Sequence, residues 1–275
     1  MATADTRISR VGQTLINIAL RAAVPAFGFL AMIALWAAGV TLSGVPPYIL
    51  PGPLTVAATM IGDWHILGPA LWATTKTTLL ALLFALFGGW GIAVSLAQAR
   101  WMEAFFAPLA VAIQVTPIVA IAPLIAIYAP TPLVAQLICA FIVAFFPIML
   151  STLQGLKSAE RHHADLLRTY GASRWQTFRY LQIPSALPGI FGGVKIGAGL
   201  ALVGAVVAEF SVGQAGEHAG LAFRLLEAQS RLFTPRVFAA LVLLAGLGAL
   251  LFSATAFLSW LVLRRWHESE RASKG

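Results

Sequence analysis

Long apolar runs separated by short polar or proline-rich stretches dominate the chain. A run of about 20 apolar residues, at about 1.5 Å per residue, is long enough to cross the roughly 30 Å hydrocarbon core of a bilayer as a helix. By this measure the pattern predicts six membrane-spanning helices, near residues 23–43, 77–98, 104–128, 133–154, 187–209 and 237–263. The predicted fold class is therefore an all-α integral membrane protein with six transmembrane helices.

The stretches between these runs differ in kind. Residues 44–74 begin with the proline-rich "GVPPYILPGP", which favours extended or turn structure, and continue with "LTVAATMIGDW", which predicts a short interfacial helix. The "APTP" at 129–132 predicts a bare turn, and residues 210–235 form the largest connection on that side. Residues 11–21 are expected along the membrane surface. The first span is too long for a signal peptide and lacks a good A-x-A site, so we expect a retained helix.

Composition supports the membrane assignment. The 275 residues are 59% hydrophobic and 10% charged, against roughly a quarter charged in soluble domains, and the mean hydropathy is +0.86. The single cysteine, Cys139, excludes an intrachain disulfide and is expected to be a buried packing residue. No linker or internal repeat divides the chain, so residues 1–275 are expected to form one transmembrane domain.

The positive charges predict the orientation. Thirteen of the 18 lysine and arginine residues fall on one side of the predicted spans, four fall on the other, and Lys195 lies inside a span. Because cytoplasmic loops are enriched in lysine and arginine, the richer side is assigned to the cytoplasm. This places the N-terminal segment 1–22, the loop at about 155–186 and the tail 264–275 inside the cell. It also explains the net charge of +8 without nucleic acid.

The loop at 155–186 contains "DLLRTYGASRWQTFRYLQIPSALPGI", which predicts two short helices. The first is expected over 158–170, with Ser158 as its N-cap and Glu160 in its first turn. Gly171 stands where a C-terminal cap requires a left-handed residue. These features predict a helix that ends at a glycine corner.

The second short helix begins with a capping box. Ser173 and Gln176 have the S-x-x-Q spacing of this motif, and Pro184 is expected to stop the helix before Ser185 caps the next one. Aromatic and basic residues alternate between these points. The pattern permits either an interfacial turn or a rigid projection that enters a groove on a cytoplasmic partner.

The same stretch resembles the cytoplasmic motif of binding-protein-dependent ABC transporter permeases, written E-A-A, three residues, G, nine residues, I-x-L-P. Asp165-Leu166-Leu167 stands where E-A-A is expected, Gly171 is the glycine, and Leu181-Gln182-Ile183-Pro184 fills the end of the motif with the spacing intact. The chain departs from the family at Asp-Leu-Leu. It also has Tyr128-Ala129-Pro130 where many relatives have Trp-Phe-Gly.

The resemblance covers most of the chain from about residue 50. It includes "PIVAIAPLIAIY", "FFPIMLSTLQGLKS" and "VVAEF", which look like permeases for nitrate, sulfonates, taurine or thiamine-related pyrimidines. It implies a type I, MetI-like importer fold and an inner-membrane homodimer that works with a cytoplasmic ATPase dimer and a periplasmic solute-binding protein. The residues it assigns to ATPase coupling are Asp165, Leu166, Leu167, Gly171, Ala172, Ser173, Trp175, Phe178 and Pro184.

The chain lacks the sequence of a nucleotide-binding site. It contains no G-x-x-x-x-G-K-[ST] motif, so ATP and magnesium are expected on the partner ATPase and no cofactor on this chain. We expect no catalysis by this chain. We also expect no metal site, because His162 and His163 are adjacent and point about 100° apart on a helix.

Two other functions are compatible with six spans, but the sequence favours them less. An intramembrane protease needs a histidine base inside the membrane, whereas all five histidines fall in loops or tails. A secondary transporter usually pairs two repeats, which six spans supply only in a dimer.

The fifth predicted span contains two ionisable residues, Lys195 and Glu209. They lie 14 positions apart, within about 40° on the helix surface, and so face one side. Either Lys195 reaches one membrane interface and Glu209 the other, or this face lines a dimer seam and transport pathway. The G-x-x-x-G spacing of Gly193 and Gly197 favours close helix approach there.

Overall fold

A computed structural model describes residues 27–98, 100–213 and 219–264. Every regular element in these ranges is a helix, as expected for the all-α class. After a helix at Phe27–Ser43, the elements are α2 (Pro53–Gly62), α3 (Trp64–Gln98), α4 (Arg100–Val115), α5 (Ile118–Tyr128), α6 (Pro132–Lys157), α7 (Arg161–Thr169), α8 (Arg174–Thr177), the π-helix η1 (Phe178–Gln182), α9 (Ile183–Val212), α10 (Leu221–Ser230) and α11 (Thr234–Leu263).

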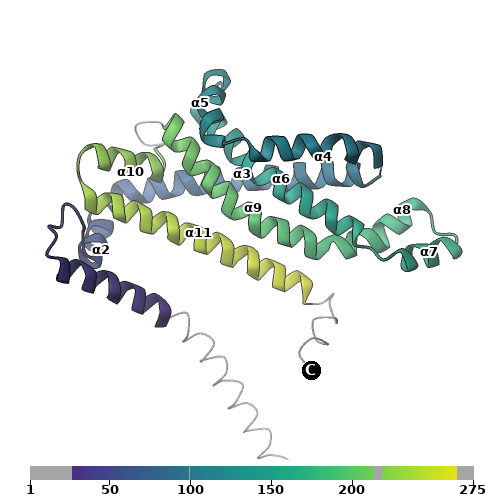
Figure 1. Ribbon diagram of the computed structural model, residues 1–275, viewed down its shortest axis with the longest axis horizontal. Helices are drawn as coiled ribbons and strands as arrows, with labels where there is room; N and C mark the ends of the chain where they lie inside the picture. Colours follow the sequence, from purple (N-terminus) through teal and green to yellow (C-terminus); the bar gives the residue numbers. More distant parts are fainter. Residues whose placement is uncertain (1–26, 99, 214–218, 265–275) are drawn as a thin grey trace, which may run out of the picture.

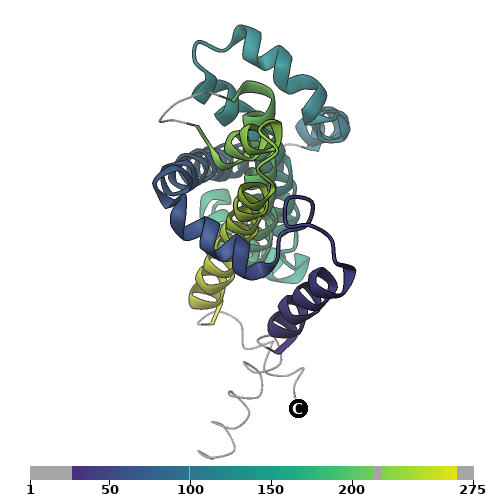
Figure 2. The same cartoon turned by 90° about the vertical axis from the view of Figure 1, so that its left-hand side faces the viewer.

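The long helices α3, α6, α9 and α11 run side by side along the molecule (Figure 1). The short helices α7 and α8 project at one end of this bundle, and α2 and α10 lie at the other. Figure 2 shows α4 and α5 set to one side of the bundle, with the helix at Phe27–Ser43 on the opposite side. The pair α7 and α8 is therefore separated from the pair α2 and α10 by the length of the long helices.

Four helical stretches in the described residues are long and apolar enough to span a membrane. They are α3, α6, the continuous stretch Arg174–Val212 that contains α9, and α11. The predicted spans at 77–98, 133–154, 187–209 and 237–263 fall within them. The helix at Phe27–Ser43 is shorter, at about 26 Å by its 17 residues, and residues 23–26 lie outside the described ranges. The predicted surface segment at 11–21 also lies outside them.

The predicted span at 104–128, in which Pro117 predicts a kink, is bent much more sharply than a kinked helix. The chain forms two helices there, α4 and α5, and their apolar parts are bent by 96° relative to each other. Pro117 occupies the N-cap position of α5 with extended dihedral angles, and the Thr116 hydroxyl donates a hydrogen bond to the Ala112 carbonyl. Proline disfavours helical conformation in the residue before it, which explains why the helix ends at Val115. Counted as one bent pair, α4 and α5 supply a fifth span.

Glycines bring α6 and α9 into close contact. A Cβ atom on Gly189 would lie 2.7 Å from the carbonyl oxygen of Ser151, and one on Gly204 would lie 2.7 Å from the Cα of Ala140. No real side chain is accommodated at these distances, so the two backbones approach as closely as small residues allow. The two helices therefore pack as one unit.

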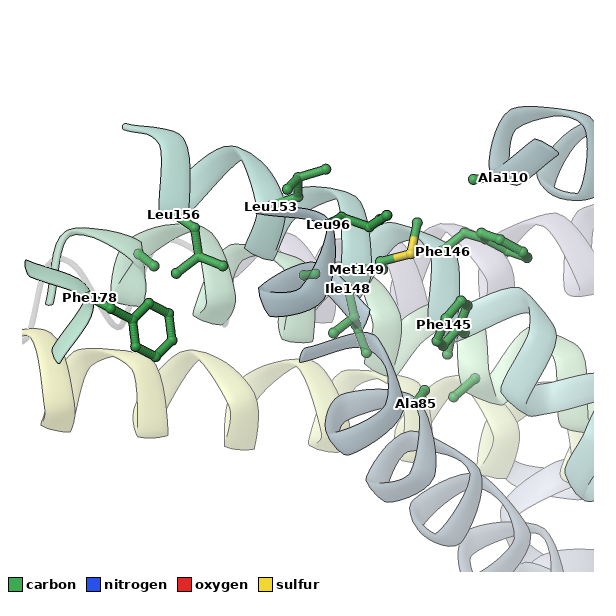
Figure 3. Packing of buried hydrophobic residues seen from close by; sticks show 14 residues of the cluster. Ala85, Leu96, Ala110, Phe145, Phe146, Ile148, Met149, Leu153, Leu156 and Phe178 are labelled. Carbon is green, nitrogen blue, oxygen red and sulfur yellow. The ribbon is translucent and has the colours of Figure 1, made fainter. Parts of the chain in front are cut away.

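The largest core cluster lies between α3, α6 and the start of α9, and it includes Phe145, Ile148, Met149 and Leu156. Figure 3 shows that the Phe178 ring lies at the end of this cluster beside Leu156. A second cluster lies at the opposite end of the bundle and joins four helices: its buried members are Val56 on α2, Leu67 and Ala70 on α3, Leu221 and Leu225 on α10, and Ala239 and Ala240 on α11. Each end of the molecule thus has its own packed core.

Of the predicted terminal segments, 1–22 lies wholly outside the described residues, and only Arg264 of the tail 264–275 lies within them.

Candidate functional site

The projecting end of the molecule is formed by α7, a tight corner, α8 and η1, and we call residues 161–182 the corner segment. Its first helix begins at Arg161, three residues later than predicted. The prediction that Ser158 caps it is wrong, because Ser158 ends α6 and donates its hydroxyl to the Gly155 carbonyl at 2.8 Å. Glu160, expected in the first turn, occupies the N-cap position without a capping bond from its side chain.

Gly171 makes the corner, as predicted. Its φ is +75°, in the left-handed region, and its N–H donates to the Arg168 carbonyl at 2.9 Å. The N–H of Ala172 donates to the Leu167 carbonyl at 3.0 Å. Together these bonds form a Schellman motif, which satisfies the last carbonyl groups of α7.

The capping box at Ser173 is also confirmed. The Gln176 N–H donates to the Ser173 hydroxyl at 3.2 Å, and the Ser173 N–H donates to the Gln176 side-chain oxygen at 2.7 Å. Both ends of the corner therefore have their backbone groups satisfied by local bonds, which holds α7 and α8 in a defined relative position.

Pro184 does not stop the second helix, and Ser185 does not cap a new one. The helix continues from Arg174 to Val212 through the π-helical turn η1, in which the Ile183 N–H donates to the Phe178 carbonyl five residues back. A proline within an α-helix removes one backbone bond and its ring collides with the carbonyl four residues earlier. The wider π-turn just before Pro184 is where the chain accommodates it.

The corner segment exposes large apolar side chains. Leu166, Tyr170, Trp175 and Tyr180 are 54%, 82%, 69% and 73% exposed. Phe178 differs from them, because its ring is buried in the chain's own core, and the tilted ring of Trp175 lies beside it at 5.6 Å between ring centroids. The buried ring holds the segment to the bundle and leaves Trp175 on its outer surface.

The other expected coupling residues lie around the corner. Asp165 is exposed and forms an ion pair of 3.4 Å with Arg168 on the same helix, while Leu167, Ala172 and Pro184 are half-buried. The structure therefore brings the family-motif positions together on one projection.

The opposite end of α9 carries a second polar arrangement, centred on Glu209. Its side chain is 1% exposed, so it does not reach a membrane interface, which was one of the two alternatives that the sequence left open for it. One carboxyl oxygen accepts from the Thr74 hydroxyl at 2.7 Å, and the other accepts from the Ala222 N–H at 2.9 Å. Thr74 also accepts from the Leu221 N–H at 2.9 Å. We call these four groups the Glu209 link, which joins α9, α3 and the first turn of α10.

The predicted glycine pair, Gly193 and Gly197, packs against α6 of the same chain. A Cβ on Gly193 would lie 2.9 Å from the Ser151 Cβ, and one on Gly197 would lie 2.6 Å from the Ile148 Cδ1. The close approach predicted by the G-x-x-x-G spacing thus occurs between α9 and α6. Lys195 is half-buried between these two positions.

Sequence reasoning missed Thr74 and the ion pair between Asp63 and Arg236. Thr74 stands in a "TTKTT" run whose polarity inside an apolar helix was the available signal. Arg236 at the start of α11 reaches Asp63 at the end of α2, with 2.7 Å between the Nε and Oδ2 atoms. No pattern in the sequence relates residues that far apart.

The sequence of this chain is similar to those of known proteins over most of its length. Residues 85–266 match the model of the family described as "Binding-protein-dependent transport system inner membrane component". The chain is 38% identical to the riboflavin transport system permease protein RibX of Chloroflexus aurantiacus, over 86% of this chain and 88% of the relative. It is 32% identical to the formylaminopyrimidine transport permease protein ThiX of Halalkalibacterium halodurans, over 84% and 90%. It is 27% identical to the taurine transport system permease protein TauC of Escherichia coli, over 80% and 81%.

Proposed function

The chain belongs to the family of inner-membrane components of binding-protein-dependent transport systems, and from this premise we propose that its corner segment is the contact through which a cytoplasmic ATPase drives import. The protein is an ABC transporter permease with membrane-spanning helices. One observation carries the proposal: within the family motif, the exposed side chains of Trp175 and Tyr180 follow the rigid corner at Gly171. Exposed aromatic side chains held by a buried ring suit a groove on a protein partner.

The proposed assembly contains two copies of this chain, an ATPase dimer that supplies ATP and magnesium, and a periplasmic solute-binding protein. The chain itself performs no catalysis. Each copy has six membrane spans in the type I, MetI-like arrangement, with the helix at Phe27–Ser43 as the first and the bent α4–α5 pair as the third. Lys195 faces the pathway or the seam between the copies. Glu209 positions α10 beside the same pathway or seam.

We propose that both termini and the corner segment lie in the cytoplasm and that α10 lies outside. The excess of lysine and arginine on the corner side supports this orientation. A membrane-impermeant thiol reagent applied to right-side-out vesicles should label a cysteine introduced at Gln229 on α10. It should leave a cysteine introduced at Arg174 unlabelled, and the reverse pattern would contradict the orientation.

The proposed solute is a small heteroaromatic compound such as a flavin or a pyrimidine. Relatives named for riboflavin and formylaminopyrimidine transport are 38% and 32% identical to this chain, against 27% for the taurine relative. Proteoliposomes containing the permease, its ATPase and its binding protein should take up riboflavin or the pyrimidine in preference to taurine. Nitrate and sulfonates serve as further competitors, and preference for any of these anions would contradict the heteroaromatic assignment.

The coupling proposal is tested by Trp175→Ala. The 69% exposed side chain contributes little to the fold, so the permease should reach the membrane at normal levels. Its ATPase should be lost during co-purification, and ATP-dependent uptake should fall. Trp72→Ala is the matched control, because Trp72 is 67% exposed on α3 and lies outside the corner segment. Equal retention of the ATPase by both variants would exclude Trp175 as a contact.

The intramembrane protease and the secondary transporter are not favoured by the comparisons.

A further inference from the structure

We propose that the Glu209 link transmits movement of the corner segment to α10 at the opposite end of the molecule. This inference rests on the proposed function, in which an ATPase moves the corner segment. It adds a positioning role for Glu209 and Thr74, which act through the first turn of α10. The movement passes through three features in turn: a continuous helix, a tight helix pair and a buried attachment.

The first step is the continuity of the helix that joins the two ends. The stretch Arg174–Val212 runs through α8, η1 and α9 without interruption for 39 residues. Trp175 on the corner segment and Glu209 therefore lie on one helix, separated by about 51 Å at 1.5 Å per residue. A displacement at one end of such a helix reaches the other end unless the helix bends between them.

The second step is the packing that prevents α9 from moving alone. Gly155, Gly189 and Gly204 bring α6 and α9 into backbone contact along most of their length. Closely packed interiors shift between discrete arrangements and do not deform continuously. We therefore treat α6 and α9 as one body, with the corner segment connecting them at one end.

The third step is the attachment of α10 to this body. The apolar residues of α10 pack in the cluster with α2, α11 and the first turns of α3, whereas its first two N–H groups bond to Glu209 and Thr74. Gly220 precedes them, and a Cβ there would overlap the Glu209 carboxyl group. Only glycine permits this approach. The polar attachment thus connects the α6–α9 body with the cluster that contains α10.

The burial of the link determines what happens when α9 moves. If α3 and α10 stayed in place, the Glu209 carboxyl group would lose both of its donors, the Thr74 hydroxyl and the Ala222 N–H, away from water, which is unfavourable for each of these groups. If the first turn of α10 follows together with Thr74 on α3, all the bonds persist. A displacement of α9 therefore carries the first turn of α10 with it.

The test uses a reporter on α10. A cysteine introduced at the exposed Gln229 is labelled with a water-soluble maleimide in the reconstituted complex, without nucleotide and after trapping with ATP and vanadate. The native Cys139 is fully buried and contributes little background. In the chain that carries only the Gln229→Cys reporter, we expect the labelling rate to differ between the nucleotide-free complex and the complex trapped with ATP and vanadate.

Glu209→Leu should abolish this difference although the ATPase is still retained, because leucine fills space and accepts no hydrogen bond. Glu209→Gln should preserve it, because the amide accepts from the Ala222 N–H through its oxygen and donates to Thr74 through its nitrogen. A purely structural role for Glu209 would lower expression or thermal stability and leave the difference in labelling intact. If Glu209→Leu fails to fold, Gly220→Ala decides the question by the same readout, because a Cβ there overlaps the Glu209 carboxyl group and displaces it from the Ala222 N–H.

The outcomes separate the two proposals. A nucleotide-dependent difference that persists in Glu209→Leu, or in Gly220→Ala, overturns the link while leaving the ATPase contact intact. An unchanged labelling rate in the parent chain with bound ATPase does the same. Failure of the parent chain to retain any ATPase overturns the proposed function and this inference together.

Discussion

Replacing Gly171 tests whether the geometry of the corner matters for coupling. Gly171 has a φ of +75°, and no atom lies within 4 Å of the position that a Cβ would occupy. A side chain therefore meets no neighbour, and its cost is that of the left-handed backbone alone, about 1–2 kcal/mol for an L-residue and most severe for a β-branched one. At about 2 kcal/mol, Gly171→Val reduces the population of the native corner roughly thirtyfold relative to a relaxed alternative.

The same chain provides a reference for this cost. Leu232 follows α10 in a second Schellman motif with a φ of 57°, and it is 84% exposed. A leucine is thus tolerated in this conformation where the surrounding structure holds it. Gly171→Asn is the matched control, because asparagine adopts the left-handed region more readily than valine does.

We expect Gly171→Val to reach the membrane at near-normal levels, since about 2 kcal/mol confined to an exposed corner does not unfold the packed spans. It should retain less ATPase during co-purification and show reduced ATP-dependent uptake in proteoliposomes, whereas Gly171→Asn should retain most of both. Normal uptake by Gly171→Val would refute the reasoning, because the corner would then be an interfacial turn without a fixed partner.

Three further predictions concern packing and charge. Gly204→Ala should destabilise the purified permease by about 1–3 kcal/mol in thermal unfolding, whereas Gly199→Ala, with open space around it, should not; equal effects would contradict the close α6–α9 packing. Phe178→Ala should cost about 3–5 kcal/mol because its ring is buried, and the exposed Tyr180→Ala should cost less than about 0.5 kcal/mol. A hydrogen bond from Arg224 lowers the pKa of Glu227 below its ordinary 4.5. The ionised Glu227 carboxylate therefore stabilises the fold fully above pH 4.5, and this stabilisation disappears as the pH falls through the lowered pKa. The stability difference between the parent chain and Glu227→Gln should therefore shrink between pH 6 and pH 3, and a constant difference would exclude this contribution.

Local rules predicted the corner correctly. The Gly171 cap and the Ser173 capping box depend on residues within five positions of each other, so the sequence contains all the information that they need. The effect of Pro184 was mispredicted because a π-turn relieves the collision that usually ends a helix. Ser158 was mispredicted because its hydroxyl had a nearer acceptor in the helix before it.

Non-local features escaped prediction. Hydropathy identifies an apolar run at 104–128 and Pro117 predicts a kink inside it, but neither gives the size of the bend between the two halves. The position of Glu209 near one end of a span left two alternatives, the membrane interface and a dimer seam or pathway. Its actual partners come from two other helices, and hydropathy assigns no partner to a buried carboxyl group.

The spacing of contacts along the chain also has a consequence for biogenesis. The close contacts between α6 and α9 join neighbouring membrane helices, so this hairpin becomes complete as soon as α9 has left the ribosome. Thr74 and Glu209 are 135 positions apart, and their bond also requires α10, which is synthesised later. Since local contacts form sooner than distant ones, we expect the hairpin to assemble early during membrane insertion and the Glu209 link to close late. A chain truncated before α10 would then insert with its coupling surface already formed and its opposite end still open to quality-control proteases.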